Sequence, residues 1–252
     1  MKSFSQRVCE ILPGALVWLT LTACVVCSLI RPLWMVYFVI LFDFYWLLRI
    51  LYFLPFLITS WYRYRQALRR NWQQETEALP GYERIHHLIF LPFAKEDPAV
   101  IRETLRVLAS TVYPAKRMLV ILGGEGRYSA RAEEVRAALE PEFRDKFFAL
   151  FFTVHPPDIA GEVVGKGSNL HWMAEQIVPK LLARGLVPEQ IIVSSFDVDT
   201  IVHPQYFSCL AYHYLTDLEP TKTSYQPVAL LYRIVLQAGA LNLLLIGHPT
   251  RI

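Results

Sequence analysis

Residues 191–200 of this chain read IIVSSFDVDT. The apolar run predicts a buried strand from Gln190 to Phe196, and two carboxylates, Asp197 and Asp199, follow at its end. An open α/β sheet binds ligands beyond the carboxyl ends of its strands. Two ionised carboxylates repel each other, and Mg²⁺ or Mn²⁺, which prefer oxygen ligands, relieve that repulsion and can hold a diphosphate. The alternative is a pair of surface acids in a turn, which such a short motif does not exclude.

The segments before residue 190 alternate between strand and helix patterns. Strands are expected at 87–93, 118–122 and 147–154, the second of them ended by a turn at Gly123-Gly124. Helices are expected at 98–108, 129–139 and 168–182, with Pro179 bending or ending the last one. This alternation predicts an α/β fold, a parallel sheet with crossover helices.

The amino-terminal sixty residues hold two apolar runs, Ile11–Ile30 and Leu33–Ile58, separated by Arg31-Pro32. Each run reaches the roughly 20 residues that cross a bilayer. Because proline breaks a helix, residues 1–60 are expected to form a transmembrane helical hairpin. A cleaved signal peptide fits poorly, since no small-residue cleavage site precedes the second run. A buried helix pair of a soluble protein is the alternative.

Basic residues predict the orientation of this hairpin. Lys2 and Arg7 flank the first run, and four arginines follow the second, whereas the turn holds only Arg31. The positive-inside rule then places both ends, and the domain that follows, in the cytoplasm of a multi-pass membrane protein. Asp43 and Arg49 are costly inside the second run; they are either functional or satisfied within the hairpin.

Residues 61–81 carry aromatic and apolar residues at helical spacing, with arginines between them. This pattern predicts an amphipathic helix and linker on the membrane surface. A helix packed on the following domain fits the pattern equally well.

Composition limits the function classes. Hydrophobic residues make up 54% of the chain and the net charge is only +3, so nucleic acid is not an expected partner. Cys24 and Cys27 form a C-x-x-C inside the first apolar run, where zinc binding and redox chemistry lack the polar groups that they need.

Two further segments hold candidate binding residues. Glu96 lies in the acidic segment after the first strand, and Lys166 lies in the glycine-rich turn 165–169 that opens a helix. A lysine there can reach a phosphate, and the amides of the helix start add to the positive field. From the residues alone, Lys166 can equally be an exposed turn lysine and Glu96 an acid favoured by the helix dipole.

In order and spacing, these segments over residues 85–227 resemble membrane-bound family-2 glycosyltransferases of the cellulose and hyaluronan synthase type. The resemblance implies a GT-A (Rossmann-like) nucleotide-sugar-binding domain at 82–227. It implies that Glu96 contacts the nucleoside, that Lys166 lies near the diphosphate, that Asp197 lies near the ribose and the metal, and that Asp199 binds the metal. It also implies Mg²⁺ or Mn²⁺ as cofactor, a UDP-sugar as donor, and a lipid-linked or polysaccharide acceptor.

The chain departs from the family pattern at two places. Leu122-Gly123-Gly124-Glu125 stands where the family has a base-reading aspartate pair, and Glu125 is the candidate substitute. No E-D pair or Q-x-x-R-W segment follows, so the catalytic base is not identified. The apolar segment 228–252 is interpreted either as the end of a truncated or frame-shifted chain or as a third membrane segment.

Two functions follow. The first is a membrane-anchored transferase that passes a sugar from a nucleotide-diphosphate sugar to its acceptor. The second is a non-catalytic nucleotide-sugar-binding protein, or an inactive fragment. With no identified base, the chain as it stands is expected to bind donor and to transfer sugar very slowly or not at all.

Overall fold

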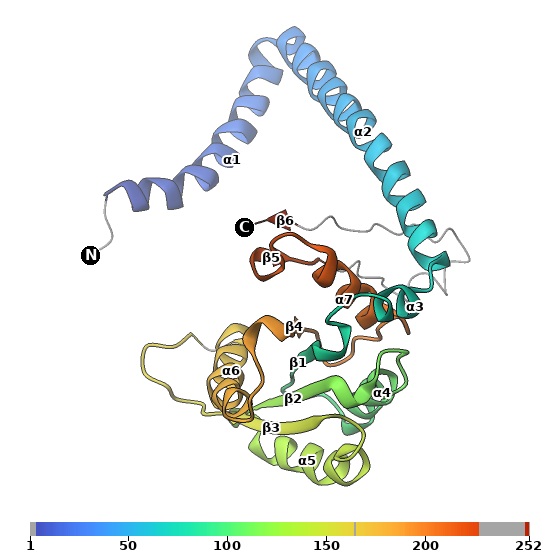
Figure 1. Cartoon of the computed structure of the whole chain (residues 1–252). Helices are drawn as coiled ribbons and strands as arrows, with labels where there is room; N and C mark the ends of the chain where they lie inside the picture. Colours follow the sequence, from blue (N-terminus) through green and yellow to red (C-terminus); the bar gives the residue numbers. More distant parts are fainter. Residues whose placement is uncertain (1–3, 164, 227–249, 252) are drawn as a thin grey trace. The chain divides into compact units, whose positions relative to one another are not determined.

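The structure is a computed structural model that describes residues 4–163, 165–226 and 250–251 (Figure 1). Contacts divide these residues into two compact units that meet between Leu68 and Arg69 in the sequence. Each unit is described by itself. The apolar segment from residue 228 onward lies outside the described residues, apart from residues 250–251.

The first unit consists of two long helices, α1 (Phe4–Ile30) and most of α2 (Pro32–Arg69), separated at Arg31. Pro13 and Pro55 lie inside the helices without ending them. Both helices are long and apolar enough to cross a membrane, and none of their apolar windows is buried. The prediction of two apolar helices with a break at Arg31-Pro32 is confirmed.

The segment expected as an interfacial helix is divided in two. Residues 61–69 continue α2 without a break, and a short helix α3 (Trp72–Glu77) follows, with the Asn71 side chain accepting a hydrogen bond from Gln74 N at 3.3 Å. Trp72 is only 6% exposed, and its ring meets the Tyr212 ring edge-on at 5.3 Å. For Trp72, therefore, the alternative of packing on the following domain holds.

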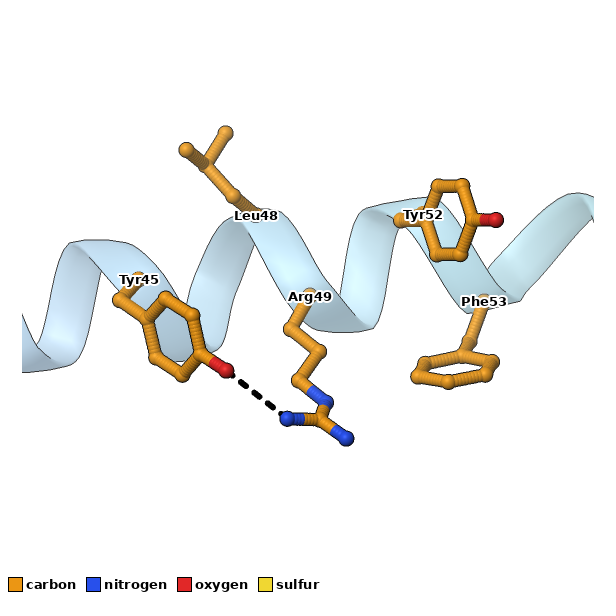
Figure 2. Close-up of a pocket in the computed structure, with 5 residues that line it drawn as sticks. All are labelled: Tyr45, Leu48, Arg49, Tyr52 and Phe53. Carbon is orange, nitrogen blue, oxygen red and sulfur yellow. Dashed lines mark hydrogen bonds between the residues drawn. The ribbon is translucent and has the colours of Figure 1, made fainter.

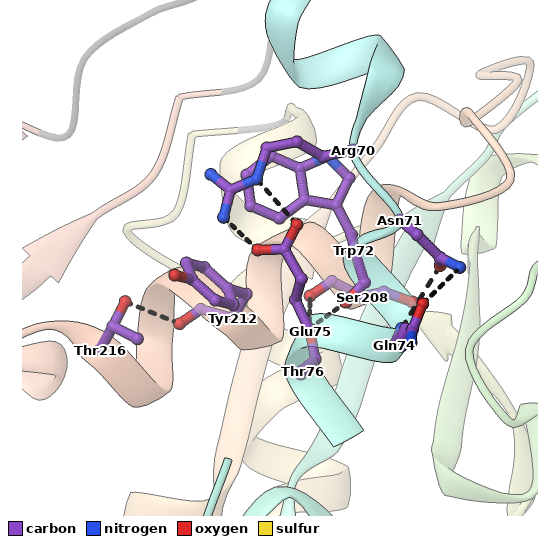
Figure 3. A network of polar contacts seen from close by, with 9 residues as sticks. All are labelled: Arg70, Asn71, Trp72, Gln74, Glu75, Thr76, Ser208, Tyr212 and Thr216. Carbon is purple, nitrogen blue, oxygen red and sulfur yellow. Dashed lines mark hydrogen bonds and ion pairs between the residues drawn. The ribbon is translucent and has the colours of Figure 1, made fainter. Parts of the chain in front are cut away.

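Figure 3 shows how α3 is held to α7 (Tyr206–Thr216). The Arg70 guanidinium makes an ion pair with Glu75 and lies 4.0 Å from the centre of the Trp72 ring. Thr76 Oγ1 donates to Ser208 O at 2.9 Å. The Glu75 carboxylate raises the pKa of Arg70, and the arginine in turn lowers the pKa of Glu75. These contacts make α3 part of the globular unit.

The globular unit is built on a four-stranded parallel sheet in the order β3-β2-β1-β4, as Figure 1 shows. Its strands are β1 (His86–Pro92), β2 (Met118–Glu125), β3 (Ala149–His155) and β4 (Ile191–Ser195). The crossover helices are α4 (Pro98–Ala109), α5 (Ser129–Phe143) and α6 (Lys166–Ala183). The predicted α/β fold with a parallel sheet is confirmed.

The two faces of the sheet are covered by different helices. Because side chains alternate along a strand, Leu88 and Ile121 pack under α6, whereas Ile89 and Val120 belong to a larger core with α4, α5 and α7. Short 3₁₀ turns lie at Tyr82–Arg84, Ala115–Arg117, Gly126–Tyr128, Pro188–Gln190 and Pro220–Lys222. A small antiparallel pair joins β5 (Thr223–Ser224) to β6 (Thr250–Arg251).

One boundary prediction is wrong. Gly123 and Gly124 do not form a turn, because β2 continues through both to Glu125. A Cβ on Gly123 would lie 2.2 Å from Met173 Sδ, and one on Gly124 would lie 2.7 Å from Ala132 Cβ. The glycines thus allow α6 and α5 to approach the strand from both faces. Pro179, expected to bend or end the helix, lies inside α6, which continues to Ala183.

Candidate functional site

The sheet order places the carboxyl ends of β1 and β4 side by side. The connection after β1 passes through α4 on one face, and the connection into β4 passes through α6 on the other face. The crevice where such connections diverge is the usual ligand site of an open α/β sheet. The loop at 93–97 leaves β1 there, and the segment 196–200 leaves β4. Phe196 N still donates to Phe90 O at 3.1 Å, which continues the strand pairing up to the two aspartates.

Asp197 and Asp199 are exposed to solvent on either side of a buried residue, Val198. Val198 is 2% exposed and belongs to the larger core, whereas both aspartates are exposed. Thr104 Oγ1 on α4 donates to Val198 O at 2.6 Å, and Thr200 N donates to Asp197 O at 2.9 Å. Backbone hydrogen bonds on the buried side therefore hold the motif in place, and both aspartates are exposed to solvent.

Lys166 begins α6, and its ammonium group forms an ion pair with Asp197. The Ser168 hydroxyl accepts from Gly165 N at 3.2 Å and donates to Gly165 O at 2.7 Å, which holds the turn before the helix. Asn169 Nδ2 donates to Gly123 O at 2.9 Å and ties this turn to β2. Two of the predicted site residues, Lys166 and Asp197, are thus brought together.

Glu96 and Glu125 make only local contacts. Glu96 is half-buried, and its carboxylate accepts from Ala94 N at 2.6 Å. The cap of α4 is instead Asp97, which accepts from Ala99 N at 2.8 Å. Glu125, at the end of β2, pairs with Arg127. Within the described ranges, no hydrogen bond or ion pair joins either glutamate to Lys166 or to the aspartates, so their predicted nucleoside contacts stay predictions.

A metal ion would find only part of its ligand set here. Among the described residues, no group of three or more His, Cys, Asp or Glu side chains is placed to hold a metal. Two exposed carboxylates nevertheless fit Mg²⁺, which typically binds through one or two carboxylates, substrate phosphates and water. The residues present therefore fit a cation that arrives with a diphosphate better than a cation alone.

Sequence reasoning missed several polar residues around this edge of the sheet. Thr104 is buried in α4 among apolar residues, and its hydroxyl bonds Val198 O. His155 ends β3 directly beside Glu125 in the strand register, and its Nε2 lies 3.1 Å from a Glu162 carboxylate oxygen. Its ring also meets Trp172 edge-on at 5.9 Å. A polar residue at the end of a predicted strand was the available signal for His155.

We expect Thr104→Val to weaken the site without changing the shape of the core. The nearly isosteric valine leaves Val198 O buried and unpaired, which costs about 1–3 kcal/mol. Thermal unfolding should show that loss. Thr216→Val is the matched control, because that hydroxyl bonds only within α7 at an exposed position. Equal behaviour of the two variants would contradict the positioning role of Thr104.

No protein-family model matches this chain, and a search of curated proteins found no match to it either.

Proposed function

We propose that this protein is a membrane-anchored glycosyltransferase of the family-2, GT-A type, whose globular unit binds a UDP-sugar with Mg²⁺ or Mn²⁺. The acceptor is a lipid-linked sugar or a polysaccharide. The observation that carries the proposal is the meeting of Lys166 and Asp197, 31 positions apart in the sequence, at the carboxyl edge of a parallel sheet. Asp199 stands exposed beside them.

The contacts of these residues agree with the roles that we propose for them. Lys166, at the amino-terminal end of an eighteen-residue helix, would exchange Asp197 for a phosphate oxygen of the donor. That exchange would leave the Asp197 and Asp199 carboxylates available to the cation, whose charge compensates the leaving diphosphate. Thr104 keeps the two aspartates in position through Val198.

Calorimetry on the full chain in detergent tests this proposal. A UDP-sugar should bind about tenfold or more tightly with Mn²⁺ than with EDTA, because the aspartates repel the diphosphate unless a cation lies between them. Equal affinity in both conditions would contradict the proposal. A radiolabelled-sugar transfer assay in membranes then separates a transferase from a protein that only binds the donor. Because no catalytic base is identified, transfer by this chain should be very slow or absent.

We also propose that α1 and α2 cross the membrane with the amino terminus and the globular unit in the cytoplasm. The support is the excess of basic residues at the two outer ends of the hairpin. Reporters inserted at Arg31 and after Gly161, which lies in an exposed loop, should give opposite results, external at Arg31 and cytoplasmic at Gly161. Labelling of the Gly161 reporter from outside intact cells would overturn this orientation.

A further inference from the structure

Arg49 carries a positive charge in the middle of the apolar helix α2 (Figure 2). Its Nη1 donates to the Tyr45 hydroxyl at 2.8 Å, and its guanidinium lies 5.5 Å from the centre of the Trp46 ring. Within the described part of the chain, no carboxylate forms an ion pair with it. A hydroxyl and an aromatic face give the guanidinium polar contacts, but they do not neutralise its charge.

If Leu33, where the apolar run begins, lies at one boundary of the hydrocarbon core, Arg49 lies near the opposite boundary. Arg49 is sixteen positions after Leu33, the start of the apolar run, which corresponds to about 24 Å along the helix axis. The hydrocarbon core is about 30 Å thick. An arginine side chain at that depth reaches the headgroup region. Arg63 and Arg65 follow towards the same face and attract anionic lipids to it.

We propose that Arg49 and Tyr45 bind the phosphate of an anionic membrane lipid. The guanidinium presents a planar set of donors that matches a phosphate. The Tyr45 oxygen accepts from Arg49, so its own hydroxyl proton remains able to bond the same phosphate. Leu48 and Phe53 line the same shallow hollow on the helix and provide apolar contact for an acyl chain. This inference requires that α2 crosses a membrane, but it does not depend on the donor site.

A second copy of the chain satisfies Arg49 less well than a lipid does. The nearest acid in α2 is Asp43, six positions away, about 9 Å along the axis and on a different helix face. Two copies aligned side by side would therefore bring Arg49 against Arg49 rather than against Asp43. A lipid phosphate supplies the missing negative charge without such a conflict.

Native mass spectrometry of the full chain, titrated with phosphatidic acid or phosphatidylcholine, tests the proposal. Arg49→Gln should weaken phosphatidic acid binding about tenfold, the loss expected for hydrogen bonds to a charged group, with phosphatidylcholine binding unchanged. Arg65→Gln is the matched control, because Arg65 also stacks on a tryptophan, Trp61, at 5.5 Å but follows the apolar run. It should lower phosphatidic acid binding by no more than about fivefold, the general attraction of one surface arginine for anionic lipid, and by less than Arg49→Gln does.

A second variant and a competitor keep the test decisive. Tyr45→Phe keeps the charge and removes only the hydroxyl, so it should cost about two- to fivefold even if Arg49→Gln disturbs membrane insertion. Excess inorganic phosphate should not displace the lipid. Three results would each overturn the proposal: equal losses for Arg49→Gln and Arg65→Gln, displacement by inorganic phosphate, or a dimer that disappears in Arg49→Gln while lipid binding persists.

Discussion

Asp199→Ala will lower the affinity for a UDP-sugar in the presence of Mn²⁺ by about tenfold or more, whereas the affinity in EDTA should not fall, because one carboxylate that repels the diphosphate is removed. The two exposed aspartates are the only carboxylates assigned to the cation, and the described residues offer no group of three metal ligands. Asp199→Ala therefore removes one of the two carboxylates that the protein would supply to the cation. Calorimetric titrations in both conditions measure the change.

Two further variants make this result specific. Asp158→Ala makes the same change of charge in the exposed loop between β3 and α6, and it should bind the donor like the wild type. Asp197→Ala removes a cation ligand and also the partner of Lys166, so it should lose metal dependence as well. If Asp199→Ala and Asp158→Ala retain the same metal dependence, the assignment of the D-x-D motif is wrong.

The globular unit will lose stability in acid because of His87, a buried histidine of β1. Its ring is 0% exposed and lies between the rings of Tyr113 and Phe207, at 4.6 and 4.9 Å. No hydrogen bond of normal geometry reaches either ring nitrogen among the described residues, and the Tyr113 hydroxyl already donates to Ile85 O. Burial, with a smaller contribution from His86, lowers the pKa of His87 from 6.5 to about 3.

The direction of the pH effect follows from that shift. Below pH 6.5 the unfolded chain binds a proton at His87, but the folded chain does not until the pH nears 3. The free energy of unfolding should therefore be unaffected above pH 6.5 and fall by about 1.4 kcal/mol per pH unit below it. Denaturant unfolding at pH 7 and pH 5 measures this slope.

His87→Phe should remove the contribution of His87 to the acid slope. It should also be more stable than the wild type at pH 5, because it no longer buries unpaired ring nitrogens. His171→Gln, an exposed change in α6, should retain the full slope. A wild-type slope in His87→Phe would show that other groups control acid unfolding.

Local pattern was sufficient to predict most of the elements. The apolar runs gave both long helices, and alternating strand and helix patterns gave the parallel sheet. The closeness of Lys166 and Asp197 was also predictable, because helix starts and strand ends meet at one edge of such a sheet. The roles of Glu96 and Glu125 stay predictions, since both make only local contacts.

The remaining features depend on contacts between distant residues. Gly123-Gly124 looks like a turn by itself, and only the approach of Met173 and Ala132 makes glycine necessary inside a strand. Thr104 bonds Val198 across 94 positions, which no local pattern reveals. The order of the strands in the sheet likewise depends on contacts between residues that are far apart in the sequence.

Paramagnetic broadening of amide signals by Mn²⁺, measured on the full chain with UDP bound, locates the cation directly. A cation held at Asp197 and Asp199 should broaden the amides of Val198, Asp199 and Gly167 most strongly. It should broaden those of Ile85 and Leu186, at the opposite edge of the sheet, least, and Mg²⁺ should produce no broadening. Broadening centred away from residues 197–199, or the same pattern in Asp199→Ala, would contradict a metal-dependent diphosphate site at this edge.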